Sequence, residues 1–194
     1  MVKTDSLRIR YLFPLLLLLF PYSGSAGDLE QGKQAYLAGD YTKALQLWKP
    51  LAENGDPDAQ FNLGLLYRKG QGVPNNDRLA IMWFIRAAKQ GMTDAQYNAG
   101  VMYMEGRGVS VSRLDALKWW QLAAEKNHIG AIYNLGVMHA YGMATAKDIP
   151  YAISLWKQAA EQGHPDARDT LYKTYSRGLF EQKIDLEEAA KWKK

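Results

Sequence analysis

Residues 59–73 read AQFNLGLLYRKGQGV, and residues 95–109 repeat the pattern as AQYNAGVMYMEGRGV. The two stretches lie 36 residues apart, and a weaker copy, AIYNLGVMHAYGMAT, follows at the same distance in residues 131–145. Self-similarity at one fixed period is typical of repeat proteins, in which each unit stacks on the next. The period therefore predicts a solenoid over most of the chain.

Each period has the pattern of two helices. Apolar residues recur at spacings of 4, 7 and 8 in residues 59–67, and at 3, 4, 7 and 8 in residues 80–88, so each segment has one apolar face. One column of the repeat holds residues that cap helix N-termini well, and another holds glycines where first helices should end. These columns are Asp40, Asn76, Ser112 and Asp148, and Gly70, Gly106, Gly142 and Gly178. Strand-like alternation is absent from the sequence, which predicts an all-α protein.

Small and large residues occupy separate columns of the repeat. We expect the small ones to let facing helices approach closely, and the large rings to fill the space between neighbouring hairpins. The columns are Gly64, Gly100 and Gly136, the Ala pairs beginning at 87, 123 and 159, and the rings Trp48, Phe84, Trp120, Trp156 and Trp192. A single hairpin cannot cover its own apolar face, so these residues are predicted to form a core and not a cofactor site.

The N-terminal segment, positions 1–26, has the layout of a secretory signal peptide. Three basic residues precede an apolar stretch from Tyr11 to Phe20, and a run of small residues ends at Ala26. This stretch is shorter than the about 20 residues of a transmembrane helix, so no stable membrane insertion is expected after cleavage. Retention as an uncleaved anchor is the alternative. The sequence predicts a signal peptide at 1–26, a solenoid at 27–194 and a periplasmic or secreted protein.

Composition excludes several classes of function. The 194 residues are 47% apolar and 23% charged, as in ordinary folded proteins. There is no cysteine, which excludes disulfides, zinc–cysteine sites and thiol catalysis. Cleavage after Ala26 would remove three basic side chains and one acidic one and lower the net charge from +4 to +2, which gives no basis for nucleic-acid binding. The three histidines form no metal-binding pattern, so neither a metal nor another cofactor is expected.

The quoted segments resemble Sel1-like repeats, a subfamily of the tetratricopeptide-repeat superfamily. The resemblance covers about residues 29–194, divided into hairpins at about 29–55, 56–91, 92–127, 128–163 and 164–194, of which the last has a C-terminal cap. It implies a right-handed α-solenoid whose first helices line a concave surface. It also implies that the protein acts as an adaptor in protein–protein contacts. Many exported bacterial members carry one disulfide per repeat, whereas this chain must rely on packing.

The first-helix positions that do not face the core are expected to line that concave surface. Three asparagines in one column could pair with the backbone of an extended peptide, because an amide offers both donors and acceptors. Rings and aliphatic side chains beside them would add buried area. Alternatively, the asparagines only bond between helices. The predicted peptide-binding residues are Phe61, Asn62, Leu65, Arg68, Tyr97, Asn98, Val101, Met104, Tyr133, Asn134 and Val137, with Ala140 in the same register.

These features favour an exported, non-enzymatic scaffold that binds a peptide or protein segment. A host-directed secreted effector is one alternative. A small envelope enzyme is another, because Ser154 and Lys157 match the Ser-x-x-Lys pattern of penicillin-recognising enzymes, although the companion Lys-Thr-Gly and Ser-Asp-Asn motifs are missing. Charged residues on the second helices, such as Arg86, Lys89, Lys118 and Glu125, are expected to form a solvated outer face.

Overall fold

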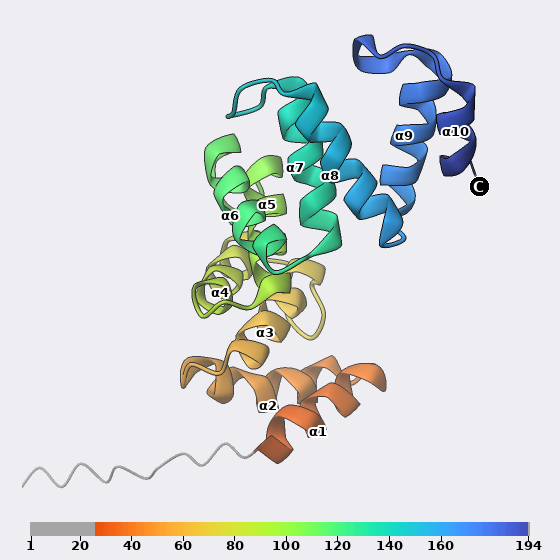
Figure 1. The fold of residues 1–194 in the computed structure, drawn as a ribbon. Helices are drawn as coiled ribbons and strands as arrows, with labels where there is room; N and C mark the ends of the chain where they lie inside the picture. Colours follow the sequence, from red (N-terminus) through yellow and green to blue (C-terminus); the bar gives the residue numbers. More distant parts are fainter. Residues whose placement is uncertain (1–25, 194) are drawn as a thin grey trace, which may run out of the picture.

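The computed structural model describes residues 26–193, and in this part of the chain all regular structure is helical. Ten α-helices form five pairs. The pairs are α1 (Ala26–Leu37) with α2 (Tyr41–Glu53), α3 (Pro57–Lys69) with α4 (Asp77–Lys89), α5 (Thr93–Glu105) with α6 (Arg113–Glu125), α7 (Ile129–Tyr141) with α8 (Ile149–Glu161), and α9 (Pro165–Arg177) with α10 (Leu186–Trp192), the last two joined through the 3₁₀ turn η1 (Leu179–Glu181). The pairs follow one another in chain order from one end of the molecule to the other (Figure 1). The predicted all-α solenoid is confirmed, while the expected signal peptide lies, apart from Ala26, outside the described residues.

The helix boundaries follow from the predicted capping columns. The side chains of Asp40, Asn76, Ser112 and Asp148 accept hydrogen bonds from the backbone N–H three residues on, at 3.0, 3.0, 3.2 and 2.9 Å. Gly70, Gly106, Gly142 and Gly178 end the first helices in the left-handed region, with φ between 63° and 70°. Each cap satisfies backbone groups that the helix itself leaves unpaired, so these two columns determine where the second helices begin and where the first helices end.

The glycine column receives the large rings, which corrects one expectation. A Cβ added to Gly100 would lie 2.4 Å from Nε1 of Trp120, a ring on the second helix of the same hairpin. The indole N–H of Trp120 also donates to the carbonyl oxygen of Tyr97 at 3.2 Å. The same ring-on-glycine contact joins Gly32 to Trp48, Gly64 to Phe84 and Gly136 to Trp156. The rings therefore pack within their own hairpins as well as toward the next one, where Trp156 meets Phe180 with ring centroids 5.2 Å apart, so the expectation that they fill the space between neighbouring hairpins is incomplete.

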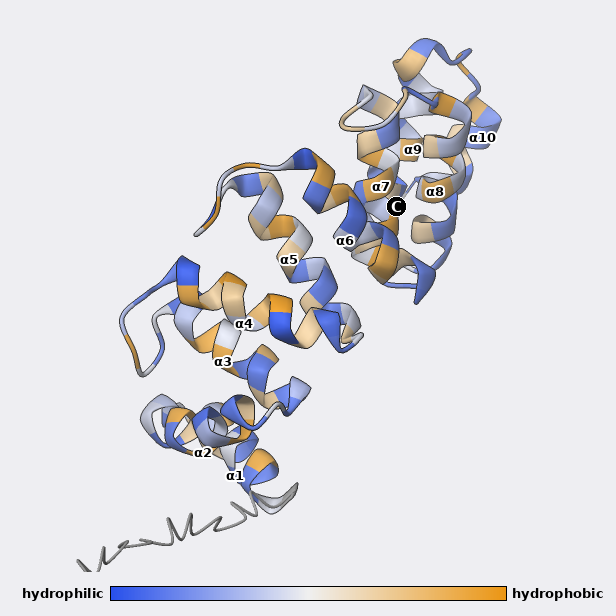
Figure 2. Cartoon of the chain, turned by 90° about the vertical axis from the view of Figure 1, so that its left-hand side faces the viewer, coloured by the Kyte–Doolittle hydropathy of each residue, from blue (hydrophilic) through white to orange (hydrophobic). Residues whose placement is uncertain are grey.

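Alanines form the contact between successive hairpins. Ala87, Ala123 and Ala159 near the ends of second helices, and Ala95, Ala131 and Ala167 near the starts of the next first helices, are all fully buried. Because these side chains are small, the end of one hairpin can pack closely against the beginning of the next. Figure 2 shows hydrophobic residues in stripes along the helices, with mostly hydrophilic loops. Among the described residues, no helix is both long and apolar enough to cross a membrane.

Candidate peptide-binding surface

The predicted binding residues lie on α3, α5 and α7, the first helices of three consecutive hairpins. All eleven of them are half-buried, which leaves part of each side chain facing solvent. Ala140 was expected at the same face, but it is 1% exposed and belongs to the core. That one assignment is wrong, because the short side chain of Ala140 is covered by its core neighbours, whereas the longer side chains of Arg68 and Met104 at the same register position stay partly exposed. We refer to the eleven remaining residues as the first-helix surface.

The aromatic column of this surface is partly covered by the next hairpin. The ring of Tyr97 stacks on His128, with centroids 4.4 Å apart and planes inclined by 21°. Tyr133 stacks on His164 in the same way, at 4.6 Å and 17°. One face of each tyrosine ring therefore serves the contact between hairpins. Sequence reasoning placed the histidines in a loop column and missed this role, although each follows its tyrosine at the same spacing in the sequence.

The same two histidines are helix N-caps. Nδ1 of His128 accepts a hydrogen bond from the N–H of Ala131 at 3.1 Å, and Nδ1 of His164 accepts one from Ala167 at 3.3 Å. An accepting Nδ1 requires a neutral ring whose proton is on Nε2. Burial lowers the pKa of both histidines, against the opposing effect of a nearby carboxylate, Asp94 for His128 and Asp166 for His164. Both rings are thus held in the neutral form that capping needs.

This arrangement predicts a stability that depends on pH. The pKa of each histidine is lower in the folded chain than the ordinary 6.5, so the unfolded chain binds protons more readily. The contribution of the two histidines to the free energy of unfolding is therefore complete above pH 6.5 and is lost as the pH falls below that value. Protonation also places a positive charge at a helix N-terminus, where it is unfavourable. We expect thermal unfolding between pH 7 and pH 5 to show a larger decrease in midpoint for the natural chain than for His128→Asn with His164→Asn, since asparagine caps helices without titrating. Parallel pH profiles of the two proteins would contradict the capping role.

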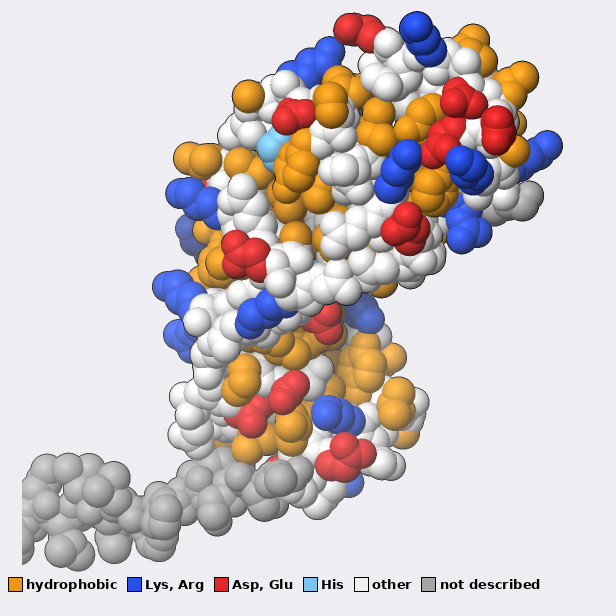
Figure 3. Space-filling model, viewed as in Figure 1, with side chains coloured by type: hydrophobic (Ala, Val, Ile, Leu, Met, Phe, Trp, Pro, Cys, Tyr) orange, Lys and Arg blue, Asp and Glu red, His pale blue; other side chains and the backbone are white. Residues whose placement is uncertain are grey.

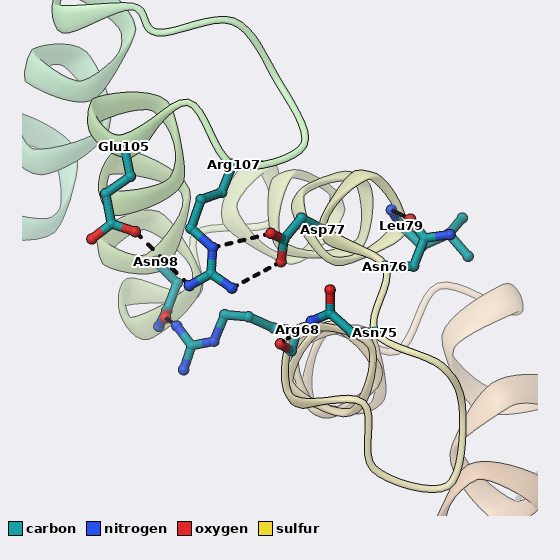
Figure 4. A network of polar contacts seen from close by, with 8 residues as sticks. All are labelled: Arg68, Asn75, Asn76, Asp77, Leu79, Asn98, Glu105 and Arg107. Atoms are coloured by element: carbon teal, nitrogen blue, oxygen red, sulfur yellow. Dashed lines mark hydrogen bonds and ion pairs between the residues drawn. The ribbon is translucent and has the colours of Figure 1, made fainter.

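The asparagine column divides into one bonded and two free amides. Oδ1 of Asn98 accepts a hydrogen bond from Arg68, and its Nδ2 donates to the carbonyl of Asp94 at 2.7 Å. Figure 4 shows Arg68 reaching from α3 to Asn98 on α5. At this position the asparagine bonds between helices. No hydrogen bond joins the side chain of Asn62 or Asn134 to any other residue in the described part of the chain, so both amides are available to a ligand.

A second polar contact fixes the spacing of α4 and α5. The guanidinium of Arg107, which follows α5, donates to both carboxylate oxygens of Asp77 at the start of α4, at 3.1 and 3.0 Å (Figure 4). These hydrogen bonds raise the pKa of Arg107 further above its usual value. Two parallel N–H to oxygen bonds define orientation as well as distance. Together with the Arg68–Asn98 bond, they hold the second and third hairpins in one arrangement, so that the first-helix surface between them is preformed.

The Ser-x-x-Lys pattern does not form a catalytic pair. Oγ of Ser154 donates to the carbonyl of Tyr151 in its own helix at 2.7 Å. Nζ of Lys157 lies 2.8 Å from Glu188, and this hydrogen bond raises the pKa of the lysine. A protonated, ion-paired lysine cannot serve as the base for a serine that it does not contact. Within residues 26–193 there is also no group of three or more His, Asp or Glu side chains that could hold a metal ion.

Helical hairpins that stack one on the next in chain order define the class of α-solenoid repeat proteins. The model of the Sel1 repeat matches residues 27–56, 57–92, 93–128 and 129–164, and the chain belongs to the Sel1 repeat family. The comparison with curated proteins finds no match. Sel1 repeat proteins generally mediate protein–protein interactions and are typically non-catalytic scaffolds.

Solved structures give the same fold. The chain is similar to c5321, described as a protective antigen present in uropathogenic Escherichia coli strains displaying an SLR fold, with 36% identity, a TM-score of 0.81, and coverage of 88% of this chain but 37% of that one. It is also similar to a Sel1 repeat protein from Oxalobacter formigenes, with 33% identity, a TM-score of 0.76, and coverage of 84% and 67% of the two chains. Helicobacter pylori cysteine rich protein B, at 19% identity and a TM-score of 0.50 over 77% and 99%, shares the fold alone. The chain spans just over a third of the length of c5321.

Proposed function

We propose that this chain is an exported, non-enzymatic scaffold that binds an extended peptide or protein segment on its first-helix surface. The observation that supports the proposal most strongly is the pair of free amides, Asn62 and Asn134, set among half-buried aliphatic and aromatic side chains. Free amides can hydrogen bond to a peptide backbone of any sequence, while Leu65, Val101 and Val137 would bury its side chains. The ligand is thus a protein segment without strong net charge.

The test uses short peptides selected from a random library for binding to the natural chain. Loss of both free amides in the variant Asn62→Ala with Asn134→Ala should weaken binding of these peptides about ten-fold or more, since two hydrogen bonds of about 1 kcal/mol each are lost. The matched control is Gln121→Ala, an exposed amide on the outer helix α6. Unchanged peptide affinity in the double variant, measured by fluorescence anisotropy, would overturn the proposed site.

Asn98 provides an internal comparison for the same experiment. Because its amide already bonds to Arg68 and Asp94, Asn98→Ala should disturb the stability of the α3–α5 contact more than it disturbs peptide contacts. We therefore expect the midpoint of thermal unfolding to fall for Asn98→Ala, and the peptide affinity to fall for the Asn62 and Asn134 pair. A reversed pattern would place the ligand amide at Asn98.

Export is part of the proposal. It rests on the layout of residues 1–26, and the similarity to a protein described as a protective antigen supports a location outside the cytoplasm. The same similarity favours the alternative of a host-directed effector. Fractionation of producing cells separates the two: we expect the processed chain in the periplasm, whereas the effector alternative requires it in the medium. Recovery of the chain with an intact N-terminus from the cytoplasm would overturn both.

A further inference from the structure

The outer face carries a groove that the proposed first-helix surface does not use. Between α4 and α6 lies a hollow of about 410 Å³, and its lining includes Ile85 of α4, Tyr103 of α5, and Trp119 and Leu122 of α6. A second hollow, of about 530 Å³, continues along α4 past Met82 to the loop Gly108–Ser110. The two hollows share Ile85 and Lys89 of α4, so they lie side by side along this helix, and we call them together the α4–α6 groove.

The rim of the α4–α6 groove is strongly basic. Arg78, Arg86 and Lys89 of α4 and Lys118 of α6 line it, all four are exposed, and none forms an ion pair with another described residue. Figure 3 shows Lys and Arg side chains along the edge of the molecule where Figure 1 places α4 and α6. Arg86 lies over the ring of Trp83 at 4.5 Å, a contact that leaves its charge in place. Asp115 is the one carboxylate among the residues that line the two hollows.

The neighbouring groove on the same face has a different charge. Between α6 and α8 a hollow of about 480 Å³ is lined by Glu125, Gln121, Gln158 and Tyr151, with no lysine or arginine among its lining residues. In both hollows the intervening first helix contributes to the lining, Tyr103 of α5 in one, and Ile132 and Leu135 of α7 in the other, which is a consequence of the repeat. The basic rim is therefore a property of the α4–α6 position and not of the fold, and the two grooves cannot prefer the same ligand.

We propose that the α4–α6 groove binds an acidic amphipathic helix of a partner protein. A helix that enters a groove between two helices places apolar residues at spacings of three and four against the groove lining, here against Ile85, Trp119 and Leu122. Acidic residues on its flanks then meet the four rim cations, and this charge complementarity sets specificity and speeds association. Tyr103, which comes from the first helix α5 and is half-buried, lines the hollow together with side chains of α4 and α6, an arrangement that a helix inserted between them would fill.

The test uses a labelled synthetic helical peptide with leucine at positions i, i+3, i+4 and i+7 and glutamate on both flanks, and a partner peptide with lysine in place of each glutamate. We expect the acidic peptide to bind the full chain at least ten-fold more tightly than the basic one, with the difference shrinking at high salt. Lys89→Glu with Lys118→Glu should remove at least ten-fold of that affinity. The matched control, Lys43→Glu with Lys49→Glu, makes the same charge change at exposed positions of α2 and should leave the affinity unchanged.

Three results would overturn this proposal. The first is equal binding of the acidic and basic peptides, and the second is an equal loss of affinity in the α2 control. The third is that the acidic peptide does not bind, while the chain binds vesicles of equimolar phosphatidylcholine and phosphatidylserine through Lys89 and Lys118. The last result would assign the rim to an anionic membrane. Binding here is expected to be unaffected by Asn62→Ala with Asn134→Ala, so failure of this proposal and failure of the proposed function are separate outcomes.

Discussion

Gly100→Leu should lower the free energy of unfolding by about 3 kcal/mol, the upper part of the usual range for overpacked cores. The position has no room even for a Cβ, which would lie 2.4 Å from Nε1 and 2.5 Å from Cδ1 of Trp120. A larger side chain must displace the indole ring and break its hydrogen bond to Tyr97. Urea denaturation followed by far-UV circular dichroism measures the loss. A change below about 0.5 kcal/mol would contradict the ring-on-glycine packing, because only surface substitutions are normally so mild.

A double-mutant cycle isolates the contact between the glycine and the ring. Gly100→Ala should destabilise the natural chain, because the added methyl group meets the indole. In a Trp120→Ala background the same substitution should be neutral or stabilising, since alanine favours a helix over glycine by up to about 1 kcal/mol. A change of sign between the two backgrounds is the expected result. Equal effects in both backgrounds would mean that Gly100 is needed for another reason.

Removal of residues 184–194 should destabilise the last hairpin and promote aggregation. The deleted segment contains α10, whose Ala189 is buried against the preceding helix. It also contains Glu188, which bonds to Lys157 of α8 at 2.8 Å. This hydrogen bond and a second one from Lys191 lower the pKa of the Glu188 carboxyl group to about 2. Without α10, the apolar side of α9 around the fully buried Leu171 faces water.

The size of the spectroscopic change makes this prediction specific. The deletion removes α10, which has 7 residues. We expect the loss of helical signal at 222 nm to be larger than 7 residues account for, because part of the 13-residue helix α9 frays when α10 is missing. Removal of residues 193–194 only, which leaves α10 in place, is the control. A soluble truncated protein that retains the full signal of α9 would contradict the role of α10 as a cap.

The fold was predictable because its determinants are local and repeated. The N-cap column that includes Asn76 and the glycine column that includes Gly106 determine the helix ends, and their common period determines the stacking. The mutual position of Gly100 and Trp120 was not predictable, since two residues 20 apart in sequence meet only through the angle at which the helices pair. Periodicity identifies which residues are buried, but not which neighbour each one contacts.

The register predicted which first-helix positions stay partly exposed, but not which of their side chains already have partners. Register alone placed Asn62, Asn98 and Asn134 in equivalent positions, yet only Asn98 finds a partner, because α3 happens to carry Arg68 opposite it. The capping role of His128 escaped detection because histidine is a rare N-cap, and its neutral ring depends on burial that the sequence does not reveal. Differences between repeats, and not the repeat itself, determine these functional details.

Site-specific photo-crosslinking tests the central claim most directly. A crosslinking residue is placed in turn at Asn134 on the first-helix surface and at Ser154, an exposed position on the outer helix α8, in the cells that naturally produce the chain. Irradiation at position 134 should yield one discrete adduct, and mass spectrometry identifies the partner segment that is crosslinked. A synthetic peptide of that segment should then compete with the library-selected peptides for binding to the chain. Position 154 should yield none. Capture of the same partner only from position 154, or equally from both positions, would contradict binding on the first-helix surface.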